Sequence, residues 1–448
     1  MTSDEETTIE LRHALDEVPV LDPHTHLVGG QLVARGLHDI LLYHMVVSDL
    51  YAAGCPSGAR LTEYPLSPSQ EEAESRIEEA LPYLPLIRNT SSYWGVRIIL
   101  DRLYKWTATI TRENWKEVDS LIRERSHDAN WGHSLLDRLN VHRSGTEIAR
   151  RGTGADDDRL QYALEWGFFT RCQWGEFDTA LYELERCWGR SPESPSPIGK
   201  GRRPATEKSI CDLTDVHKAI NHYVNAIPYS QVLATATHIS TDIRFRFDVS
   251  DAEMEAALAK RSHAGAAERD IYASYIQEAF LTALEPHASE IVYQFSLGAE
   301  PLPFETAARC SQQTIAELAE MIGRHPKLRF QCFLASRHAN QSLCSLAREL
   351  PNLSLAGCWW HNVFPDTSGR IIRERLDMLP MNKQIAFFSD AYCVEWTFAK
   401  LAIFRRQLAK ALSEREIRGQ YSRQDSLAVA KAILFESPQT LLGMKPRA

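Results

Sequence analysis

The sequence predicts an α/β fold, a (β/α)8 TIM-like barrel with a helical insertion after the first strand. An apolar run at residues 18–21 leads directly into Asp22-Pro23-His24-Thr25-His26, and a second apolar run at residues 384–389 leads into Asp390. Strand-like and helix-like segments alternate from about residue 139 onward, which is typical of βα units. The chain of 448 residues exceeds a minimal barrel of about 250 residues, so it has room for one sizeable insertion.

The first predicted strand ends in a pair of histidines. Because successive side chains of an extended segment alternate between two faces, His24 and His26 project to the same side and could bind one divalent metal ion. The C-terminal end of a barrel strand is where such barrels keep their chemistry. Taken alone, the His-x-His pattern is equally compatible with two surface or core histidines.

Residues 36–138 are predicted to be helical. We interpret them as an insertion between residues 1–35, which hold the N-terminal segment and the first barrel strand, and residues 139–448, which hold the remainder of the barrel and the C-terminal helices. Ser67-Pro68-Ser69-Gln70 supplies an N-cap, a Pro at the first helical position and a Gln at the third, ahead of a helical pattern at residues 72–86. Two more helices are predicted at residues 94–104 and 111–125.

The remainder of the chain predicts strands and capped helices in alternation. Ser250-Asp251-Ala252-Glu253 is typical of a helix start, and the helix is predicted to run to Lys260. Residues 191–204 are rich in Pro, Ser and Gly, which favours an exposed loop. The candidate strands after the insertion are residues 163–170, 231–236, 291–297, 328–334, 353–358 and 384–389.

Asp390 follows the last of these strands and adds a carboxylate to the same rim. Two neutral imidazoles and one carboxylate leave an open position on zinc or manganese, which is the arrangement of a catalytic metal site. Asp390 could instead be the N-cap of the helix that follows it. The histidine pair at the other end of the chain favours the metal, and we expect one divalent ion held by His24, His26 and Asp390.

Composition narrows the class of protein. The apolar share of 44%, the charged share of 24% and the net charge of −9 are ordinary for a soluble globular protein and argue against a nucleic-acid or anionic-membrane partner. The nine cysteines contain no Cys-x-x-Cys pair, which indicates a reducing compartment. The acidic N-terminus lacks the features of a signal peptide. We therefore expect a cytoplasmic enzyme with a small-molecule substrate; a homo-oligomer is compatible with the sequence.

Motifs spread in order along the chain resemble those of the uronate (glucuronate) isomerases, a branch of the amidohydrolase superfamily of metal-dependent barrels. They cover nearly the full length, which makes them more specific together than singly. The matching segments are Asp22 to Leu27, Asp49-Leu50-Tyr51 before Ala53-Gly54, Ala256 to Arg261, Leu297-Gly298-Ala299, Trp359-Trp360-His361-Asn362, and Ser389-Asp390 with the long helix after it.

The resemblance implies an aldose–ketose isomerisation of a hexuronate, of the D-glucuronate to D-fructuronate type, through proton transfer between C1 and C2. It implies that His24, His26 and Asp390 hold the metal, that Tyr51 lies near the substrate, and that Trp359 and Trp360 belong to a substrate-binding Trp-Trp motif. His238 matches a family histidine. A carboxylate such as Asp390 can move the C2 proton, and the helical insertion could exclude water as a lid.

The sequence departs from this family at several polar positions. Leu50 stands where the family carries a histidine, Ser296 stands where it carries a middle-strand histidine, and Tyr392 stands where it carries an arginine for the uronate carboxylate. An arginine after strand three has no secure counterpart, although Arg171 lies close to its position. Because losing a bidentate guanidinium removes a strong handle on a carboxylate, Arg171 and Arg337 are the candidate replacements.

Several of these residues also have plainer interpretations. His238 could be a satisfied polar residue at a strand end, Arg337 could be a solvated loop residue, and Trp359 and Trp360 could be core aromatics. His44 and the other remaining histidines carry no predicted role. The alternative function is a metal-dependent hydrolase of the amidohydrolase superfamily, and a third is a binding protein that has lost catalysis, which the intact metal triad disfavours.

Overall fold

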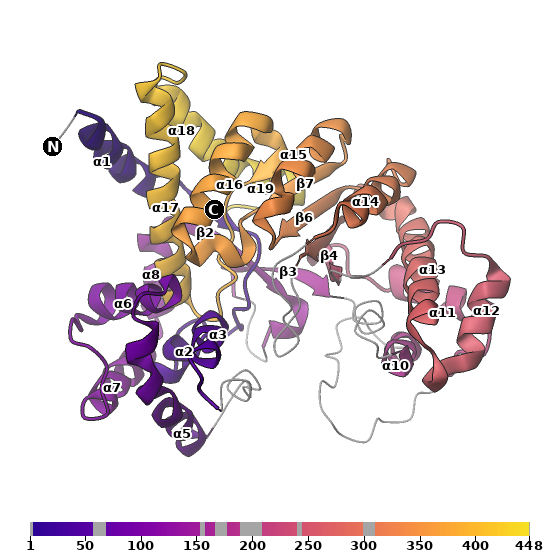
Figure 1. The fold of residues 1–448 in the computed structure, drawn as a ribbon, viewed down its shortest axis with the longest axis horizontal. Coiled ribbons are helices and arrows are strands. Elements are labelled where there is room, and N and C mark those ends of the chain that lie inside the picture. The colour runs from indigo at the N-terminus through magenta and orange to yellow at the C-terminus, as the bar shows by residue number, and fades with distance from the viewer. Residues whose placement is uncertain are drawn as a thin grey trace.

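The computed structural model describes residues 3–56, 69–152, 157–165, 177–188, 208–239, 244–298 and 310–447. Within them, eight strands form one sheet in sequential order, and every neighbouring pair is parallel (Figure 1). The strands are β1 (Val20–Asp22), β2 (Val141–Glu147), β3 (Leu160–Glu165), β4 (Val232–Ile239), β5 (Val292–Leu297), β6 (Phe330–Leu334), β7 (Leu353–Ala356) and β8 (Gln384–Ile385).

The segments after β8 and β1 join the two ends of this sheet. The backbone N–H of Asp390 donates to the carbonyl of His24 at 2.9 Å, and the N–H of His26 donates to the carbonyl of Ala391 at 2.8 Å. The N–H of Ser389 donates to the Asp22 carboxylate at 2.8 Å. These bonds confirm the predicted α/β barrel and place the two chain segments that carry the predicted metal ligands side by side.

The observed strands differ from the predicted ones in three main respects. β2 was not among the candidate strands, because Val-His-Arg-Ser-Gly-Thr-Glu has little of the apolar character of a buried strand. β8 contains only two residues, and the apolar residues that follow it continue as irregular chain toward Asp390. The predicted strand at residues 163–170 begins earlier, at Leu160, and its residues 166–170 lie outside the described part of the chain, as does the predicted loop at residues 191–204.

Helices occupy the described chain between β1 and β2 from Leu37 onward, as expected. Ser69 caps the helix that follows it by accepting a hydrogen bond from the Glu72 N–H at 3.1 Å. Gly95 allows close packing on the long helix α17 (Val394–Ile417), because a Cβ there would lie 2.6 Å from the Trp396 ring. The helices are α2 (Leu37–Leu41), α3 (His44–Ala52), α5 (Gln70–Ala80), η1 (Leu81–Ile87), α6 (Ser91–Tyr104), α7 (Trp115–Ser126) and α8 (Trp131–Arg138).

A second group of helices lies beside the strands, on the side opposite the helices that precede β2 (Figure 1). Ser250 and Glu253 form the predicted capping box at the start of α12. The sequence did not predict that these helices pack together as one group, because each has a length typical of a connection between two barrel strands. It consists of α10 (Phe177–Cys187), α11 (Leu213–Asn225), α12 (Asp251–Lys260), η3 (Arg261–His263), α13 (Ala266–Leu284) and η4 (Glu285–His287).

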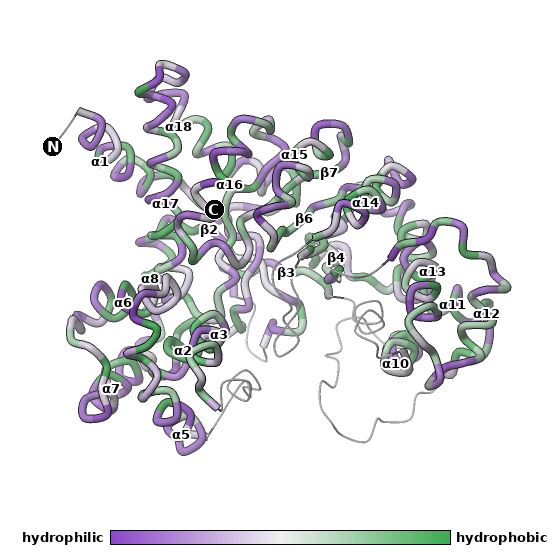
Figure 2. The backbone as a smooth tube through the Cα atoms, viewed as in Figure 1, coloured by the Kyte–Doolittle hydropathy of each residue, from purple (hydrophilic) through white to green (hydrophobic). Residues whose placement is uncertain are grey.

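The remaining helices cover the outside of the barrel and its floor. Most helices in Figure 2 alternate between hydrophilic and hydrophobic segments, as expected for helices that bury one face. Leu442 and Met444 pack against Leu21 and Ile385 inside the barrel, so the C-terminal end of the described chain closes the floor. These helices are α1 (Ser3–Asp16), η2 (Ile148–Arg150), α14 (Gln312–Arg324), η5 (Arg337–Ala339), α15 (Asn340–Glu349), η6 (Trp359–Val363), α16 (Pro365–Met378), η7 (Met381–Lys383), α17, α18 (Arg423–Lys431), η8 (Ala432–Glu436) and α19 (Ser437–Leu442).

Among the helices that the structure describes, none combines the length and the apolar character needed to cross a membrane.

Candidate metal centre

His24, His26 and Asp390 converge at the C-terminal rim of the barrel. The Oδ1 atom of Asp390 lies 3.3 Å from His24 Nε2 and 3.2 Å from His26 Nε2. The three donor atoms all lie within 4.8 Å of one another. Donors that surround a tetrahedral ion at about 2.0–2.2 Å lie roughly 3.3–3.6 Å apart. The spacing and the mixed nitrogen and oxygen donors therefore fit a divalent metal ion.

Glu147, at the end of β2, supports His26 from the other side. Its Oε1 atom lies 3.0 Å from His26 Nδ1, and its Oε2 atom lies 3.2 Å from Arg150 Nε. A histidine that binds a metal through one nitrogen usually donates a hydrogen bond from the other, which fixes the ring and raises its basicity. Glu147 is placed to accept that hydrogen bond.

The two carboxylates change how readily His26 loses its proton. Burial by itself lowers the pKa of His26, but the hydrogen bonds to Asp390 and Glu147 outweigh it and raise the pKa to about 9. Burial raises the pKa of Asp390, but the hydrogen bonds from His24 and His26 and the charge of Lys400 hold that pKa well below its usual range. Asp390 is therefore ionised at neutral pH, as a metal ligand or proton acceptor must be.

Asp390 is held in a strained position by residues beneath it. Its φ of 53° lies in the left-handed region, which is uncommon for a residue other than glycine and often marks a functional site. Its carbonyl accepts a hydrogen bond from the Tyr43 hydroxyl at 2.7 Å. Lys400 donates to that hydroxyl at 2.6 Å and lies 3.9 Å from Asp390 Oδ2. Burial lowers the pKa of Lys400 to about 8 against the pull of Asp390 and Asp22.

His44 is the residue of α3 that reaches this site. Its Nε2 atom lies 3.7 Å from Asp390 Oδ2, and burial lowers its pKa to about 3, so the ring is neutral. Tyr51, which was expected near the substrate, lies seven residues later, about 10 Å along the helix, and its side chain is 52% exposed. Leu50 is fully buried. The structure therefore brings the first residue of α3, His44, close to Asp390, and the expected place of Tyr51 near the substrate stays a prediction.

His238 and Trp359 lie together on the same rim. Their rings stack with centroids 5.9 Å apart, and the Ser296 hydroxyl hydrogen-bonds to His238 Nδ1. Burial, helped by the charges of His24 and His26, lowers the pKa of His238 to about 4. Trp359 is buried in the barrel-interior cluster and has a φ of 35°. It is therefore a core aromatic whose ring also stacks on a histidine of the rim.

The other predicted residues differ in how closely they approach the three ligands. The Tyr392 ring stacks on His26 with centroids 4.6 Å apart. Arg337 is half-buried in the turn after β6, where its charge acts on His361. Arg171 and the side chain of Trp360 lie outside the described part of the structure.

Sequence reasoning did not identify Glu147, Arg150, Tyr43, His44 or Lys400 at this site. A usable signal existed for the first two, because only seven strands were predicted for a barrel that needs eight. The missing strand had to lie near residue 139, where the βα alternation begins. Lys400 could have been found as a single charge within the apolar stretch Phe398-Ala399-Lys400-Leu401. No comparable signal pointed to Tyr43 or His44.

Comparisons with known proteins rest on structure. No sequence-family model matches the chain, and no curated protein matches it in sequence. The glucuronate isomerase from Caulobacter crescentus superimposes with a TM-score of 0.77 at 14% identity, over 100% of this chain and 95% of that one.

Two further solved structures are similar. An uronate isomerase from Bacillus halodurans gives a TM-score of 0.71 at 16% identity, over 100% of this chain and 98% of that one. A proposed metal-dependent hydrolase from Lactobacillus casei gives 0.58 at 13% identity, over 97% of each chain. From its first strand to its C-terminal helices, the chain has the fold of the uronate isomerases.

Proposed function

We propose that this protein is a metal-dependent aldose–ketose isomerase that acts on a hexuronate or a related sugar acid. The observation that carries the proposal is the convergence of His24, His26 and Asp390 on one point of the barrel rim. The similarity in fold to uronate and glucuronate isomerases supports the reaction class. The rim also holds an arginine, Arg150, which a sugar acid requires more than a neutral sugar does.

His24, His26 and Asp390 are the proposed ligands of one divalent ion, with zinc or manganese both suited to this donor set. When bound there, the ion would polarise the C1 carbonyl and the C2 hydroxyl of the sugar. Glu147 would keep His26 in the orientation that ligation requires, since it lies on the opposite ring nitrogen.

Asp390 is the proposed proton carrier between C2 and C1. Its Oδ1 atom faces the two histidines, while its Oδ2 atom faces His44 and Lys400. The charge of Lys400 favours the ionised carboxylate, which can accept the C2 proton. The neutral rings of His44 and His238 add polar groups to the rim without adding charge. An enediol intermediate also needs protection from water, and the helices between β1 and β2, which bring His44 to the rim, are suited to that task.

Arg150 is the proposed handle on the substrate carboxylate. It follows β2 at the rim, and its guanidinium lies 5.7 Å from the Tyr392 ring centroid. The guanidinium of Arg150 therefore lies beside Tyr392, the position at which the similar family carries an arginine for the uronate carboxylate. Arg150 already contacts Glu147, which holds the guanidinium in place. Arg337 and Arg171 stay candidates for a second contact.

Arg150→Leu is expected to lower kcat/KM for D-glucuronate about 10-fold to 100-fold, mainly by raising KM. A charge-assisted hydrogen bond contributes about 1.5–3 kcal/mol. Steady-state kinetics on metal-loaded protein would measure this change. The control is Arg112→Leu, because Arg112 is exposed in the loop between α6 and α7. If Arg150→Leu is unaffected while Arg171→Ala or Arg337→Ala loses activity, the carboxylate site lies at one of those residues instead.

Metal affinity is expected to rise with pH up to about pH 9. In the metal-free protein, His26 is protonated below its raised pKa of about 9, and a protonated imidazole cannot bind a metal. Each unit of pH below that value should therefore weaken apparent Zn²⁺ affinity about tenfold through this group alone. Competition titrations with a chromophoric chelator between pH 6 and 8 would measure the slope. A pH-independent affinity would remove His26 from the ligand set.

An assay of metal-reconstituted protein against uronates, sugar lactones and N-acyl compounds tests the proposed reaction. Conversion of a uronate to its ketose supports isomerisation. Hydrolysis of a lactone or an N-acyl compound without ketose formation would favour a metal-dependent hydrolase instead. The hydrolase alternative is motivated by Tyr392, which offers one neutral hydroxyl where the similar family carries an arginine for the uronate carboxylate.

A further inference from the structure

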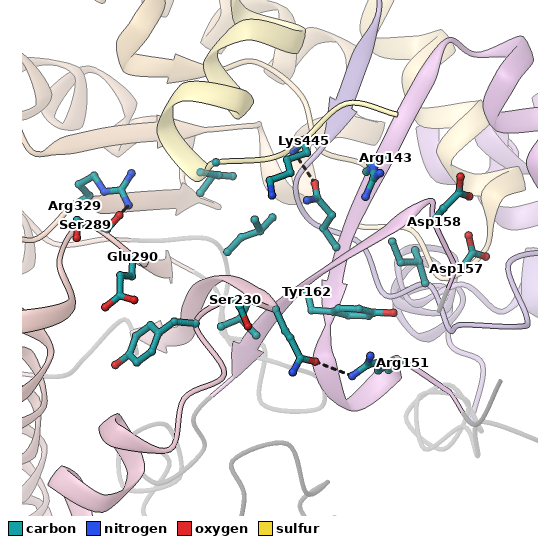
Figure 3. Close-up of a pocket in the computed structure, with 18 residues that line it drawn as sticks. Arg143, Arg151, Asp157, Asp158, Tyr162, Ser230, Ser289, Glu290, Arg329 and Lys445 are labelled. Carbon is teal, nitrogen blue, oxygen red and sulfur yellow. Dashed lines mark hydrogen bonds between the residues drawn. The ribbon is translucent and has the colours of Figure 1, made fainter. Parts of the chain in front are cut away.

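A second cavity lies at the opposite end of the barrel from the candidate metal centre. It has a volume of about 580 Å³ and is lined by early residues of β2, β3 and β4, by Arg151 after β2, by the turns before β5 and β6, and by the C-terminal residues (Figure 3). Arg143 enters it from β2, four residues before Glu147. At about 3.3 Å per residue, the two positions lie roughly 13 Å apart along the strand, so this cavity is separate from the rim site.

Arg143 extends from a position inside the barrel. It pairs in register with Leu21, which belongs to the barrel-interior cluster. Its Nε atom is buried without a hydrogen-bond partner, and no ion pair of Arg143 with a described residue was found. A partly buried guanidinium in this state favours an anion, because a buried polar group without a partner is costly.

Two further cations line the same cavity without a carboxylate partner among the described residues. Arg329 donates to the carbonyls of Ser289, Ile291 and Leu441, and its Nε atom is also buried without a partner. Lys445 lies in the exposed C-terminal segment, and its backbone N–H is bonded to Gln161. In Figure 3, Lys445 and Arg143 lie along the same edge of the cavity.

The acidic residues of the lining already have cationic or histidine partners. Asp158 lies 3.1 Å from Arg447 Nε, Asp157 lies 3.7 Å from His133, and Glu290 lies 2.8 Å from His287. Among the described residues that line the cavity, the four cations Arg143, Arg151, Arg329 and Lys445 outnumber the three carboxylates, and Asp158 is also paired with Arg447 outside the lining. The cavity therefore has an excess of positive charge, and a concave site with one sign of charge in excess concentrates counter-ions.

We propose that this cavity binds a phosphate group through Arg143, Arg329 and Lys445. Phosphate accepts paired hydrogen bonds from a guanidinium fork and carries enough charge to answer several cations. Cavities of about 300–1,000 Å³ hold small organic ligands, so the volume accommodates a sugar phosphate as well as the free ion. Tyr162 and Tyr229 line the cavity and offer ring surfaces for the organic part.

Calorimetric titration of the metal-loaded protein with inorganic phosphate and with glucose 6-phosphate tests the proposal, at ionic strength held constant with NaCl. Both probes are expected to bind, and tighter binding of the ester would assign the site to a phosphorylated metabolite rather than to the free ion. Arg143→Gln is expected to weaken binding by roughly 10-fold to 100-fold. Lys445→Gln should weaken it less, because Lys445 is exposed. Should Arg143→Gln fail to fold, Lys445→Gln carries the test.

Two control variants locate the binding. Arg112→Gln removes an exposed charge elsewhere, and Arg150→Gln removes the arginine of the rim; both should leave phosphate affinity within about twofold. The proposal is overturned if neither probe binds at 10 mM (roughly the weak limit of specific small-ligand binding). It is equally overturned if Arg143→Gln and Lys445→Gln both bind phosphate as tightly as the unmodified protein, whatever Arg150→Gln does.

Discussion

Asp390→Asn is expected to lower turnover of the sugar acid by about 10²–10⁴-fold, the usual scale for loss of a general acid–base group. The amide cannot accept the C2 proton, and it offers His24 and His26 a weaker partner than the ionised carboxylate. The backbone should tolerate the change, because asparagine is among the residues enriched at positive φ, and Asp390 has a φ of 53°. Kinetics with metal content measured on the same samples would test this.

Asp101→Asn, on the exposed side of α6, is the matched control and should retain full activity. Retained metal with lost turnover in Asp390→Asn would support proton transfer by this carboxylate. Loss of both would assign it mainly to metal binding. Undiminished turnover would remove Asp390 from the mechanism.

His26→Ala is expected to abolish stoichiometric metal binding and, with it, activity. His26 would supply one of only three protein ligands, and its ring also links Asp390 to Glu147. Glu147→Gln should be milder, with metal affinity lowered about 10-fold to 100-fold, because it changes only the partner of the distal ring nitrogen. Metal analysis after dialysis against a buffered free-Zn²⁺ series would measure both effects.

The control for this series is His127→Ala, which removes an exposed histidine after α7. It should bind metal like the unmodified protein. Full metal occupancy in His26→Ala at limiting free Zn²⁺ would show that the ion is held elsewhere.

The barrel could be predicted because its evidence is local. Apolar runs that end in polar residues and the alternation of strand and helix patterns are written in consecutive residues. β2 was not predicted as a strand because few of its side chains are apolar: they lie in the barrel interior and at the two ends of the strand rather than in an apolar core. Arg143 faces the floor cavity and Glu147 contacts His26 at the rim, so charged side chains stand where an apolar pattern would have indicated a strand.

The candidate site could be predicted only where its residues sit in a short motif. His24 and His26 are two residues apart in the segment that follows β1, and Asp390 ends an apolar run after β8, so both segments end at the same rim. Tyr43, His44 and Lys400 come from helices whose side-chain directions depend on tertiary packing, which spacing does not reveal. Tyr51 was placed near the substrate by a motif match alone, and its exposed position on α3 leaves that placement a prediction.

The proposed reaction at the metal centre is isomerisation of a sugar acid by proton transfer between C2 and C1. The most direct test follows D-glucuronate deuterated at C2 by NMR during incubation with metal-reconstituted protein in water. We expect the ketose to form, with the deuterium either transferred to C1 or lost to solvent, and no ketose to form with Asp390→Asn. Absence of the ketose, together with incorporation of solvent oxygen into a product of any compound turned over, would contradict isomerisation and indicate hydrolysis.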